Sequence, residues 1–139
     1  TAESCTGGWV AQVVTAIPGS SQWFDRGYVT YSNQAKREEL NVSEATLLSF
    51  GAVSEQAVRE MALGALRKSG ADIAVALSGV AGPGGGTPQK PVGTVCIAWA
   101  LHAANETHAA THLFQGDRAR VREQSVVVAL QGLQRLAAL

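Results

Sequence analysis

The chain has 139 residues, and its 11 Lys and Arg residues balance its 11 Asp and Glu residues, so its formal net charge is zero. A hydrophobic share of 46% with only 16% charged residues excludes a disordered chain, and a chain of this length can bury a core without disulfides or a structural metal. The neutral balance leaves no electrostatic footprint for nucleic acid or an anionic membrane. We expect one globular domain over residues 1–139.

The first half of the chain predicts short alternating elements. Apolar residues at helical spacing predict a helix over residues 8–16, which Pro18 and the glycine after it stop. Aromatic and β-branched residues predict a strand over residues 26–32. Asn33 is the expected N-cap of a helix that reaches residue 40.

Two capped helices should follow. Ser43 is the expected N-cap of a helix that ends near Phe50. Ser54 is the expected N-cap of the next helix, with Glu55 favoured in its first turn by the helix dipole and Gly70 as its C-terminal stop. The second of these helices carries a clear apolar stripe, so it should pack on a core.

The second half of the chain predicts the centre of a sheet. Residues 73–80 form a continuous apolar run, typical of a strand that is covered on both faces. A loop over residues 81–91 separates it from a second apolar strand over residues 92–100. A strand over residues 107–114 should pair antiparallel with that one, and Asp117 should cap a last helix to about residue 136.

The order of these elements predicts a three-layer α/β/α sandwich with a mixed, mostly parallel sheet. A serine that is followed by a pair of glycines and then a helix usually comes directly after a strand. We therefore expect a strand before Thr1.

The first candidate site motif is Glu-Ser-Cys-Thr-Gly-Gly, which begins at Glu3. Backbone N–H groups at the start of a helix stabilise an anion, and Gly7 and its neighbour let the backbone approach a ligand. A nucleophile such as Ser4 would have an oxyanion site within reach there. Cys5 is the rival nucleophile, because a helix N-terminus favours the thiolate. The structural alternative is an N-cap and a tight turn.

The second motif pairs Tyr31 at the end of a strand with Lys36 in the first turns of the next helix. A nearby ammonium group favours the phenolate form of a tyrosine. Either that phenolate or a desolvated lysine amine could take the proton of Ser4. The alternative is a half-buried tyrosine beside a solvated lysine.

The third motif is the glycine-rich segment that follows Ser78. Ligands of open α/β sheets bind beyond the carboxyl ends of the strands, where a loop of this kind can cradle a phosphate with its N–H groups. The segment is neither a GxGxxG fingerprint nor a P-loop, and the alternative is a long flexible loop. The loop residues expected to bind a ligand are Gly82, Gly84 and Gly85.

The fourth motif is Arg118, which follows Gly116 and Asp117 at a predicted helix start. A cation is unfavourable at that end of the helix dipole, which suggests that it binds an anion or another substrate group. Arg120 and Arg122 are expected to be ordinary surface residues.

Taken together, these segments resemble the C-terminal domain of the competence/damage-inducible CinA proteins. The resemblance covers nearly the whole chain and rests on AESCTGG, GYVTYSNQAK, GAVSEQAV, SGVAGPGGG, KPVGTV and FQGDR, which occur here in the family's order. Each motif is weak alone, but the combination is specific.

The resemblance implies a three-layer α/β/α amidase domain that deamidates nicotinamide mononucleotide to nicotinic acid mononucleotide and ammonia, a step of pyridine-nucleotide recycling. It implies a serine nucleophile at Ser4 and site roles for Tyr31, Lys36, Ser78 and Arg118. It also implies a helix and a strand before Ala2, both missing from this chain.

From these roles we expect Tyr31, with its proton affinity lowered by Lys36, to be the base that takes the proton of Ser4. The N–H groups around Cys5, Thr6 and Gly7, together with Ser78, should hold the oxyanion. Arg118 and the loop with Gly82, Gly84 and Gly85 should hold the ribose phosphate or the ring, and the alternative for Arg118 is the reacting carboxamide. No metal or cofactor is implied. The alternative is a nucleotide-binding module without catalysis.

The expected partner is a small pyridine nucleotide rather than a nucleic acid or a membrane. Cys5 and Cys96 lie far apart and form no CxxC motif, so we expect free thiols in a reducing cytoplasm. We also expect a homo-oligomer, in the form of a dimer.

Overall fold

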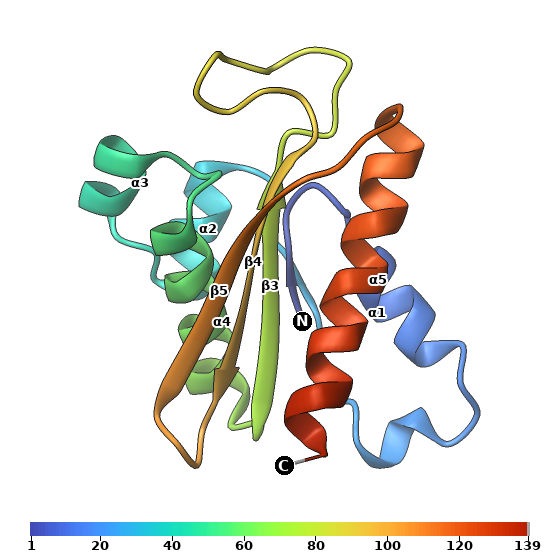
Figure 1. Ribbon diagram of the computed structural model, residues 1–139. Helices are drawn as coiled ribbons and strands as arrows, with labels where there is room; N and C mark the ends of the chain where they lie inside the picture. The colour runs from blue at the N-terminus through green and yellow to red at the C-terminus, as the bar shows by residue number, and fades with distance from the viewer. Residues whose placement is uncertain (139) are drawn as a thin grey trace.

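A five-stranded open sheet forms the middle layer of the computed structural model, which describes residues 1–138 (Figure 1). The strand order is β2-β1-β3-β4-β5, and the strands are β1 (Ala2–Glu3), β2 (Tyr28–Val29), β3 (Ile73–Gly79), β4 (Thr94–Leu101) and β5 (Glu106–Leu113). β1 pairs parallel with β2 and β3, whereas β4 pairs antiparallel with β3 and β5. The sheet is therefore mixed, as predicted, and within the described chain β4 alone runs against the other strands.

Helices cover both faces of the sheet, which confirms the predicted three-layer α/β architecture. One face carries α1 (Trp9–Thr15) and α5 (Arg118–Ala137), and the other carries α2 (Asn33–Leu40), α3 (Glu44–Phe50) and α4 (Glu55–Ser69) (Figure 1). A short 3-10 helix, η1 (Ser20–Gln22), was not predicted.

Alternate residues of β3 and β4 face opposite layers, so the sheet has one hydrophobic core on each face. The side chains of these two cores differ in size. Larger side chains such as Val75 and Ile97 pack under α1 and α5, together with Val121. Small residues such as Ala76 and Ala98 face α4 and its residue Met61, which lets that helix lie close to the sheet. Both faces are thus buried, and this explains the continuous apolar runs in the sequence.

Capping side chains set the starts of the helices on the α4 side. Ser43 and Ser54 cap α3 and α4 as predicted. The cap of α2 is Ser32 rather than Asn33, since the Ser32 hydroxyl accepts from Ala35 N at 3.0 Å. β2 is also shorter than the predicted strand, because the chain turns into this cap directly after it.

The strand that leads into Ser4 is β1, which contains Ala2 and Glu3. Its carboxyl end lies beside the carboxyl end of β3, because Ala2 pairs with Ala76 and Glu3 with Leu77. A strand that leads into Ser4 is therefore present in this chain, which corrects the expectation that it is missing.

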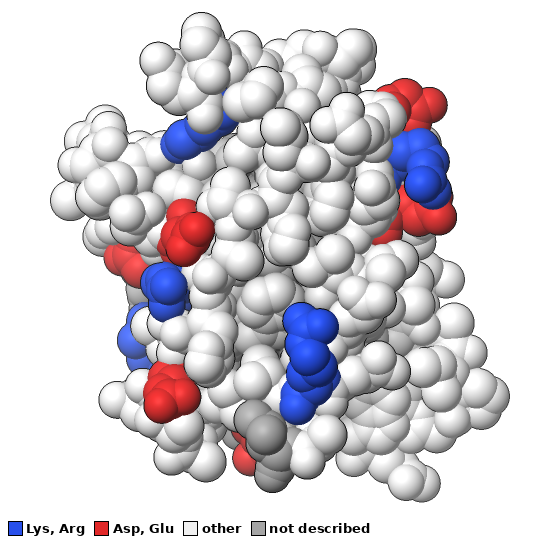
Figure 2. Space-filling model, in the orientation of Figure 1, with Lys and Arg blue, Asp and Glu red and all other residues white. Residues whose placement is uncertain are grey.

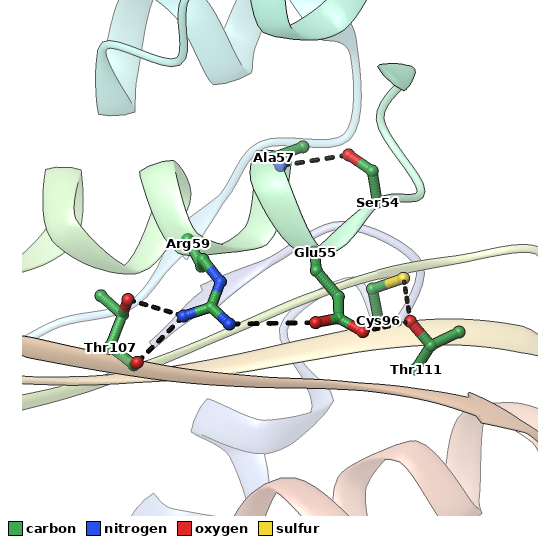
Figure 3. A network of polar contacts seen from close by, with 7 residues as sticks. All are labelled: Ser54, Glu55, Ala57, Arg59, Cys96, Thr107 and Thr111. Carbon is green, nitrogen blue, oxygen red and sulfur yellow. Dashed lines mark hydrogen bonds and ion pairs between the residues drawn. The ribbon is translucent and has the colours of Figure 1, made fainter.

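Polar contacts tie α4 to the edge strand β5 (Figure 3). Arg59 donates to the carbonyl and to the hydroxyl of Thr107, at 2.9 Å each. Glu55 accepts from the Thr111 hydroxyl at 2.8 Å, and that hydroxyl also lies 3.4 Å from the Cys96 thiol. This network fixes the edge of the sheet that lies farthest from β1.

Charged side chains lie singly or in small mixed groups on the face of the molecule drawn in Figure 2, with uncharged surface between them. This distribution agrees with the balanced composition. Among the helices of residues 1–138, none combines the length and the apolar character that crossing a membrane requires.

Candidate active site

Ser4 stands directly after β1, at the carboxyl edge of the sheet. Its N–H donates to the Leu77 carbonyl at 3.0 Å, which extends the ladder between β1 and β3 by one bond. The chain then turns through Gly7 and Gly8, with φ of 61° and 102°, before α1 begins. These left-handed conformations favour glycine, so the glycine pair fixes the sharp turn that presents Ser4.

Lys36 of α2 reaches this serine from a neighbouring layer. Its Nζ donates to Ser4 Oγ at 2.9 Å, to the Thr30 carbonyl at 2.9 Å and to the Tyr31 carbonyl at 3.1 Å. The side chain is only 1% exposed. Three acceptors therefore direct the amine at the serine hydroxyl and leave it little freedom to turn away.

Burial lowers the pKa of the Lys36 amine below its ordinary value. Within residues 1–138 no carboxylate forms an ion pair with this amine. The neutral form is thus more accessible than in a solvated lysine, and a neutral amine next to a serine hydroxyl can accept its proton.

The side chain of Tyr31 points to a different partner. Its hydroxyl accepts from Arg118 Nη2 at 3.2 Å, and the residue is 60% exposed. Arg118 also donates through Nη1 to the Gly82 carbonyl at 2.7 Å. The phenol, the guanidinium group and the glycine-rich loop therefore meet, while the Tyr31 backbone holds Lys36.

A cavity of about 260 Å³ lies where these groups meet. Its lining combines Cys5, Tyr31, Arg118 and the loop residues Gly79, Val80, Ala81, Gly82, Gly84 and Gly85. A second cavity of about 660 Å³ shares Ala81 and Arg118 with the first and extends along the start of α5. The loop and the start of α5 thus form a two-part depression near Ser4.

Ser78 is 2% exposed and ends the apolar run of β3 next to this depression. The carbonyl of the residue before it, Leu77, accepts the N–H of Ser4. Ser78 therefore lies next to the site, because the residue before it in β3 is hydrogen-bonded to Ser4.

The thiol of Cys5 is 6% exposed, and its burial raises the pKa of the thiol to about 11. The thiol is the dominant form at neutral pH as a result. A thiolate is the reactive form of cysteine, so this environment disfavours the rival nucleophile.

Glu3 is a site residue that we did not predict. It is fully buried, and its carboxylate accepts from Val10 N at 2.8 Å, from Ala11 N at 3.1 Å and from the Thr6 hydroxyl at 2.7 Å. A carboxylate directly before the Ser4 turn, three residues before a threonine, was the available signal. Glu3 caps α1 across the Ser4 turn and holds the turn against the sheet.

This cap corrects the expectation that the first N–H groups of α1 are open to a ligand. Those of Val10 and Ala11 donate to Glu3, and Gly7 N donates to the Ser4 carbonyl at 3.0 Å. Among the hydrogen bonds of residues 1–138, the N–H groups of Cys5, Thr6 and Gly8 have no acceptor. Thr6 is fully buried, so the N–H groups of Cys5 and Gly8 are the donors left for an anion.

Replacing Glu3 with alanine should destabilise the domain by about 3 kcal/mol, because it leaves buried donors without an acceptor. Urea denaturation measures this loss. Glu44→Gln is the matched control, since Glu44 also stands near a helix start but is exposed, and its change should stay within ~0.5 kcal/mol. Equal stability of the Glu3 variant and the control would refute the capping role.

The expectation that Arg122 is an ordinary surface residue is wrong. Its Nε donates to the Cys5 carbonyl at 3.1 Å and its Nη2 to the Thr6 carbonyl at 3.2 Å. The guanidinium lies over Trp9, 5.4 Å from the ring centre. Arg122 follows Arg118 by four residues, so both lie on one face of α5, and this spacing was the signal in the sequence.

Metal ligation finds no support in the described part of the chain. No group of three or more His, Cys, Asp or Glu side chains gathers there in an arrangement that could hold an ion.

Curated proteins of high identity match almost the whole chain. A family model described as the CinA C-terminal domain matches residues 1–137. A relative from Escherichia coli (strain K12), named nicotinamide-nucleotide amidohydrolase PncC, is 57% identical over 133 residues, which cover 96% of this chain and 80% of that protein. A Pseudomonas putida protein of the same name is 52% identical, with coverage of 98% and 84%. A CinA-like protein from Akkermansia muciniphila is 54% identical, but the match covers only 32% of it.

Solved structures agree with this relationship. The competence/damage inducible protein CihA from Agrobacterium tumefaciens superposes with a TM-score of 0.94 at 46% identity, over 98% of this chain and 82% of that chain. A CinA superfamily protein from Escherichia coli gives a TM-score of 0.92 at 38% identity, over 97% and 77%. The chain therefore belongs to the CinA C-terminal domain family.

Proposed function

We propose that this domain is an amidohydrolase that cleaves the carboxamide of nicotinamide mononucleotide to give nicotinic acid mononucleotide and ammonia. The observation that carries the proposal is the buried Lys36 Nζ, 2.9 Å from Ser4 Oγ, beside a cavity at the carboxyl edge of the sheet. The names of relatives at 52% and 57% identity support the choice of substrate.

Ser4 Oγ attacks the amide carbon while the neutral amine of Lys36 takes its proton. The tetrahedral intermediate then collapses, the C–N bond breaks, and the Lys36 ammonium returns the proton to the leaving nitrogen, which departs as ammonia. Water attacks the resulting ester of Ser4, again with Lys36 as the base. This second step releases the carboxylic acid and restores the hydroxyl.

The proton transfer is assigned to Lys36 rather than to the phenol of Tyr31, for a geometric reason. The phenol hydrogen-bonds Arg118, whereas the atom that contacts Ser4 Oγ is Lys36 Nζ. Tyr31 then has two roles: its carbonyl orients the amine, and its ring and hydroxyl line the cavity that receives the substrate.

The N–H groups of the turn after Ser4 stabilise the oxyanion of the intermediate, because those of Cys5 and Gly8 have no acceptor of their own within residues 1–138. Arg118 and the loop with Gly82, Gly84 and Gly85 bind the ribose phosphate or the ring, since an arginine fork and open backbone N–H groups suit a phosphate. Ser78 lies buried near the end of β3, beside this region. The residues need no metal or cofactor for this chemistry.

An ammonia-release assay on nicotinamide mononucleotide tests the proposal, with calorimetric titration of the same nucleotide in parallel. We expect steady release of one ammonia per nucleotide together with binding. Binding without turnover would refute the enzyme and favour a nucleotide-binding module. Neither binding nor turnover would refute both.

The expected setting is the cytoplasm, where a small pyridine nucleotide would be met, and the expected state is a homodimer. Support for an interface comes from α3, which exposes Leu48 by 80% and Phe50 by 47%. Light scattering of the purified protein distinguishes a dimer from a monomer.

A further inference from the structure

Gly64 of α4 is the residue at which the backbones of α2 and α4 come into contact. A Cβ atom at this position would lie 2.0 Å from the Leu40 carbonyl oxygen and 2.8 Å from the carbonyl carbon of that residue. Both distances are far below van der Waals contact, so any larger residue would have to move one helix away from the other. The missing side chain of Gly64 thus sets how closely α2 lies against α4.

α2 is the helix that would move. It buries two side chains, those of Lys36 and Leu40. α4 buries seven residues, and its side chains Glu55 and Arg59 are hydrogen-bonded to β5 (Figure 3). Because α4 is held by the core and by the sheet, a methyl group at Gly64 should displace the end of α2.

The backbone of Lys36 is tied to that end of α2. Lys36 and Leu40 are four residues apart, so they lie one turn apart on the same face of the helix. The turn that follows Leu40 is also bonded to Lys36, because Val42 N donates to the Lys36 carbonyl at 3.2 Å. Leu40 and Val42 are both buried. A displacement at the contact with Gly64 therefore reaches Lys36.

The contacts of the Lys36 amine leave little room for such a displacement. Its three acceptors belong to the segments that follow β1 and β2: Ser4 Oγ and the carbonyls of Thr30 and Tyr31. A neutral amine has two N–H groups and one lone pair. The carbonyls can only accept, so both N–H groups go to them, and the lone pair is left for the hydroxyl of Ser4. Moving α2 relative to these segments turns the lone pair away from the proton that it should accept.

We propose that Gly64 is a positioning residue, whose missing side chain lets α2 lie close enough to α4 for Lys36 Nζ to meet Ser4 Oγ. The proposal rests on the amidohydrolase function above. A misplacement of about 1 Å can lower a rate by about 10²-fold even when the substitution is far from the chemistry. Gly64 acts in this way through Lys36 and contacts no substrate.

Gly64→Ala tests the proposal through the kcat, the KM and the pH–rate profile of ammonia release from nicotinamide mononucleotide. We expect kcat per folded molecule to fall at least about tenfold. KM should change less than about threefold, because the cavity beside Ser4 is lined by other elements. The midpoint of the pH–rate profile should move up, since an amine displaced toward water loses part of the desolvation that lowers its pKa.

The other titratable groups around the amine leave the sign of this pKa change to burial. Cys5 raises the pKa of the amine, but by less than burial lowers it. The carboxylate of Glu3 is bonded to the start of α1, and the hydroxyl of Tyr31 is bonded to Arg118. From α4, the carboxylate of Glu60 accepts from the N-cap residue of α3. The hydration of the amine is therefore what a displaced α2 should change.

Gly132→Ala is the matched control, because Gly132 is also a buried glycine inside a helix. A Cβ atom there would lie 2.1 Å from the Trp99 ring. Both variants thus add one methyl group to a tight helix contact and gain the same helix propensity. Gly132 belongs to α5, on the opposite face of the sheet from Lys36 (Figure 1). Gly132→Ala should lose thermal stability, but its pH midpoint should equal that of the wild type and its kcat should stay within about threefold.

Product binding separates positioning from a folding defect. Nicotinic acid mononucleotide should bind Gly64→Ala as tightly as the wild type, because Lys36 does not line the cavity. If Gly64→Ala does not fold, Leu40→Ala decides the matter. That variant removes the other side chain that α2 buries, so it should show the same fall in kcat and the same rise of the pH midpoint.

Several results would overturn the inference. These are a kcat within threefold of the wild type in the variant tested, a loss confined to KM, weaker product binding, or a lower kcat with an unmoved pH midpoint. The same midpoint shift in Gly132→Ala would overturn it as well. A wild-type protein that releases no ammonia refutes the proposed function and this inference with it, whereas an active wild type beside an equally active Gly64 variant refutes the inference alone.

Discussion

Ser4→Ala should lower the rate of ammonia release from nicotinamide mononucleotide by at least ~10³-fold, the scale of loss when a nucleophile that acts together with its base is removed. The hydroxyl is the only part of Ser4 that the proposed mechanism uses, and its N–H bond to Leu77 stays intact in the variant. Single-turnover measurement of ammonia checks the prediction. A rate near that of the wild type would mean that Ser4 is not the nucleophile.

Cys5→Ala is the matched control for the nucleophile, because it removes the neighbouring side chain and keeps the backbone. The Cys5 thiol is buried and its pKa is raised to about 11, so turnover should survive in this variant. Wild-type protein treated with hydroxylamine during turnover should form the hydroxamate of the substrate, since an ester of Ser4 can be captured by that nucleophile. An inactive Cys5 variant beside an active Ser4 variant would reverse the assignment.

Lys36→Met and Lys36→Arg should each lower kcat by about 10²–10⁴-fold, the range of general acid–base catalysis. Methionine has similar length but cannot accept a proton, and an arginine stays protonated at all working pH values. Lys68→Met is the control, since Lys68 is the exposed lysine at the end of α4. A Lys36→Arg variant with most of its activity left would exclude the amine as the base.

The pH dependence of the wild type follows from the same residue. The amine acts only when it is unprotonated, so kcat should rise with pH and level off above the pKa of Lys36. Burial lowers that pKa from 10.5, and the midpoint should therefore lie below the ordinary lysine range. A midpoint at or above 10.5 would show that a solvated lysine is titrating, in conflict with the buried position of Lys36.

The linkage to stability has the same origin and a defined sign. The unfolded chain binds a proton at Lys36 more tightly than the folded chain does, so the contribution of this residue to stability rises with pH between the two pKa values. Below the lowered pKa its burial costs stability, and above the ordinary value the effect of pH vanishes. At the pair of Ser4 and Lys36, the fold therefore loses some stability by burying an amine that would be charged in water, and the same burial makes the amine a better base.

Local sequence was sufficient to predict most of the helices and strands and several of the candidate site residues. Continuous apolar runs, which are typical of strands covered on both faces, identified β3 and β4. The capping residues Ser43, Ser54 and Asp117 identified helix starts. Such signals are local because a cap or a stripe depends on residues a few positions apart. The motif resemblance identified Ser4, Tyr31 and Lys36 as candidates, without their mutual geometry.

The roles within the site depended on contacts between distant segments. Lys36 and Ser4 are 32 residues apart, and Arg122 binds a carbonyl 117 residues before it. No periodicity or cap encodes which atom of a side chain faces such a partner. The sequence therefore favoured the phenol of Tyr31 over the amine of Lys36 as the base, and it assigned Arg122 to the surface.

By itself the sequence determined a neutral α/β chain with a mixed sheet, a glycine turn after a serine and a glycine-rich loop beyond β3. Only the tertiary structure decided that Glu3 accepts hydrogen bonds from N–H groups at the start of α1 and that Lys36 Nζ contacts Ser4 Oγ. It also decided that Arg122 binds the turn that follows Ser4. The physical reason is burial. Once packing removes water from these polar groups, each must find a partner within the protein, and those partners come from whichever segments the fold brings near.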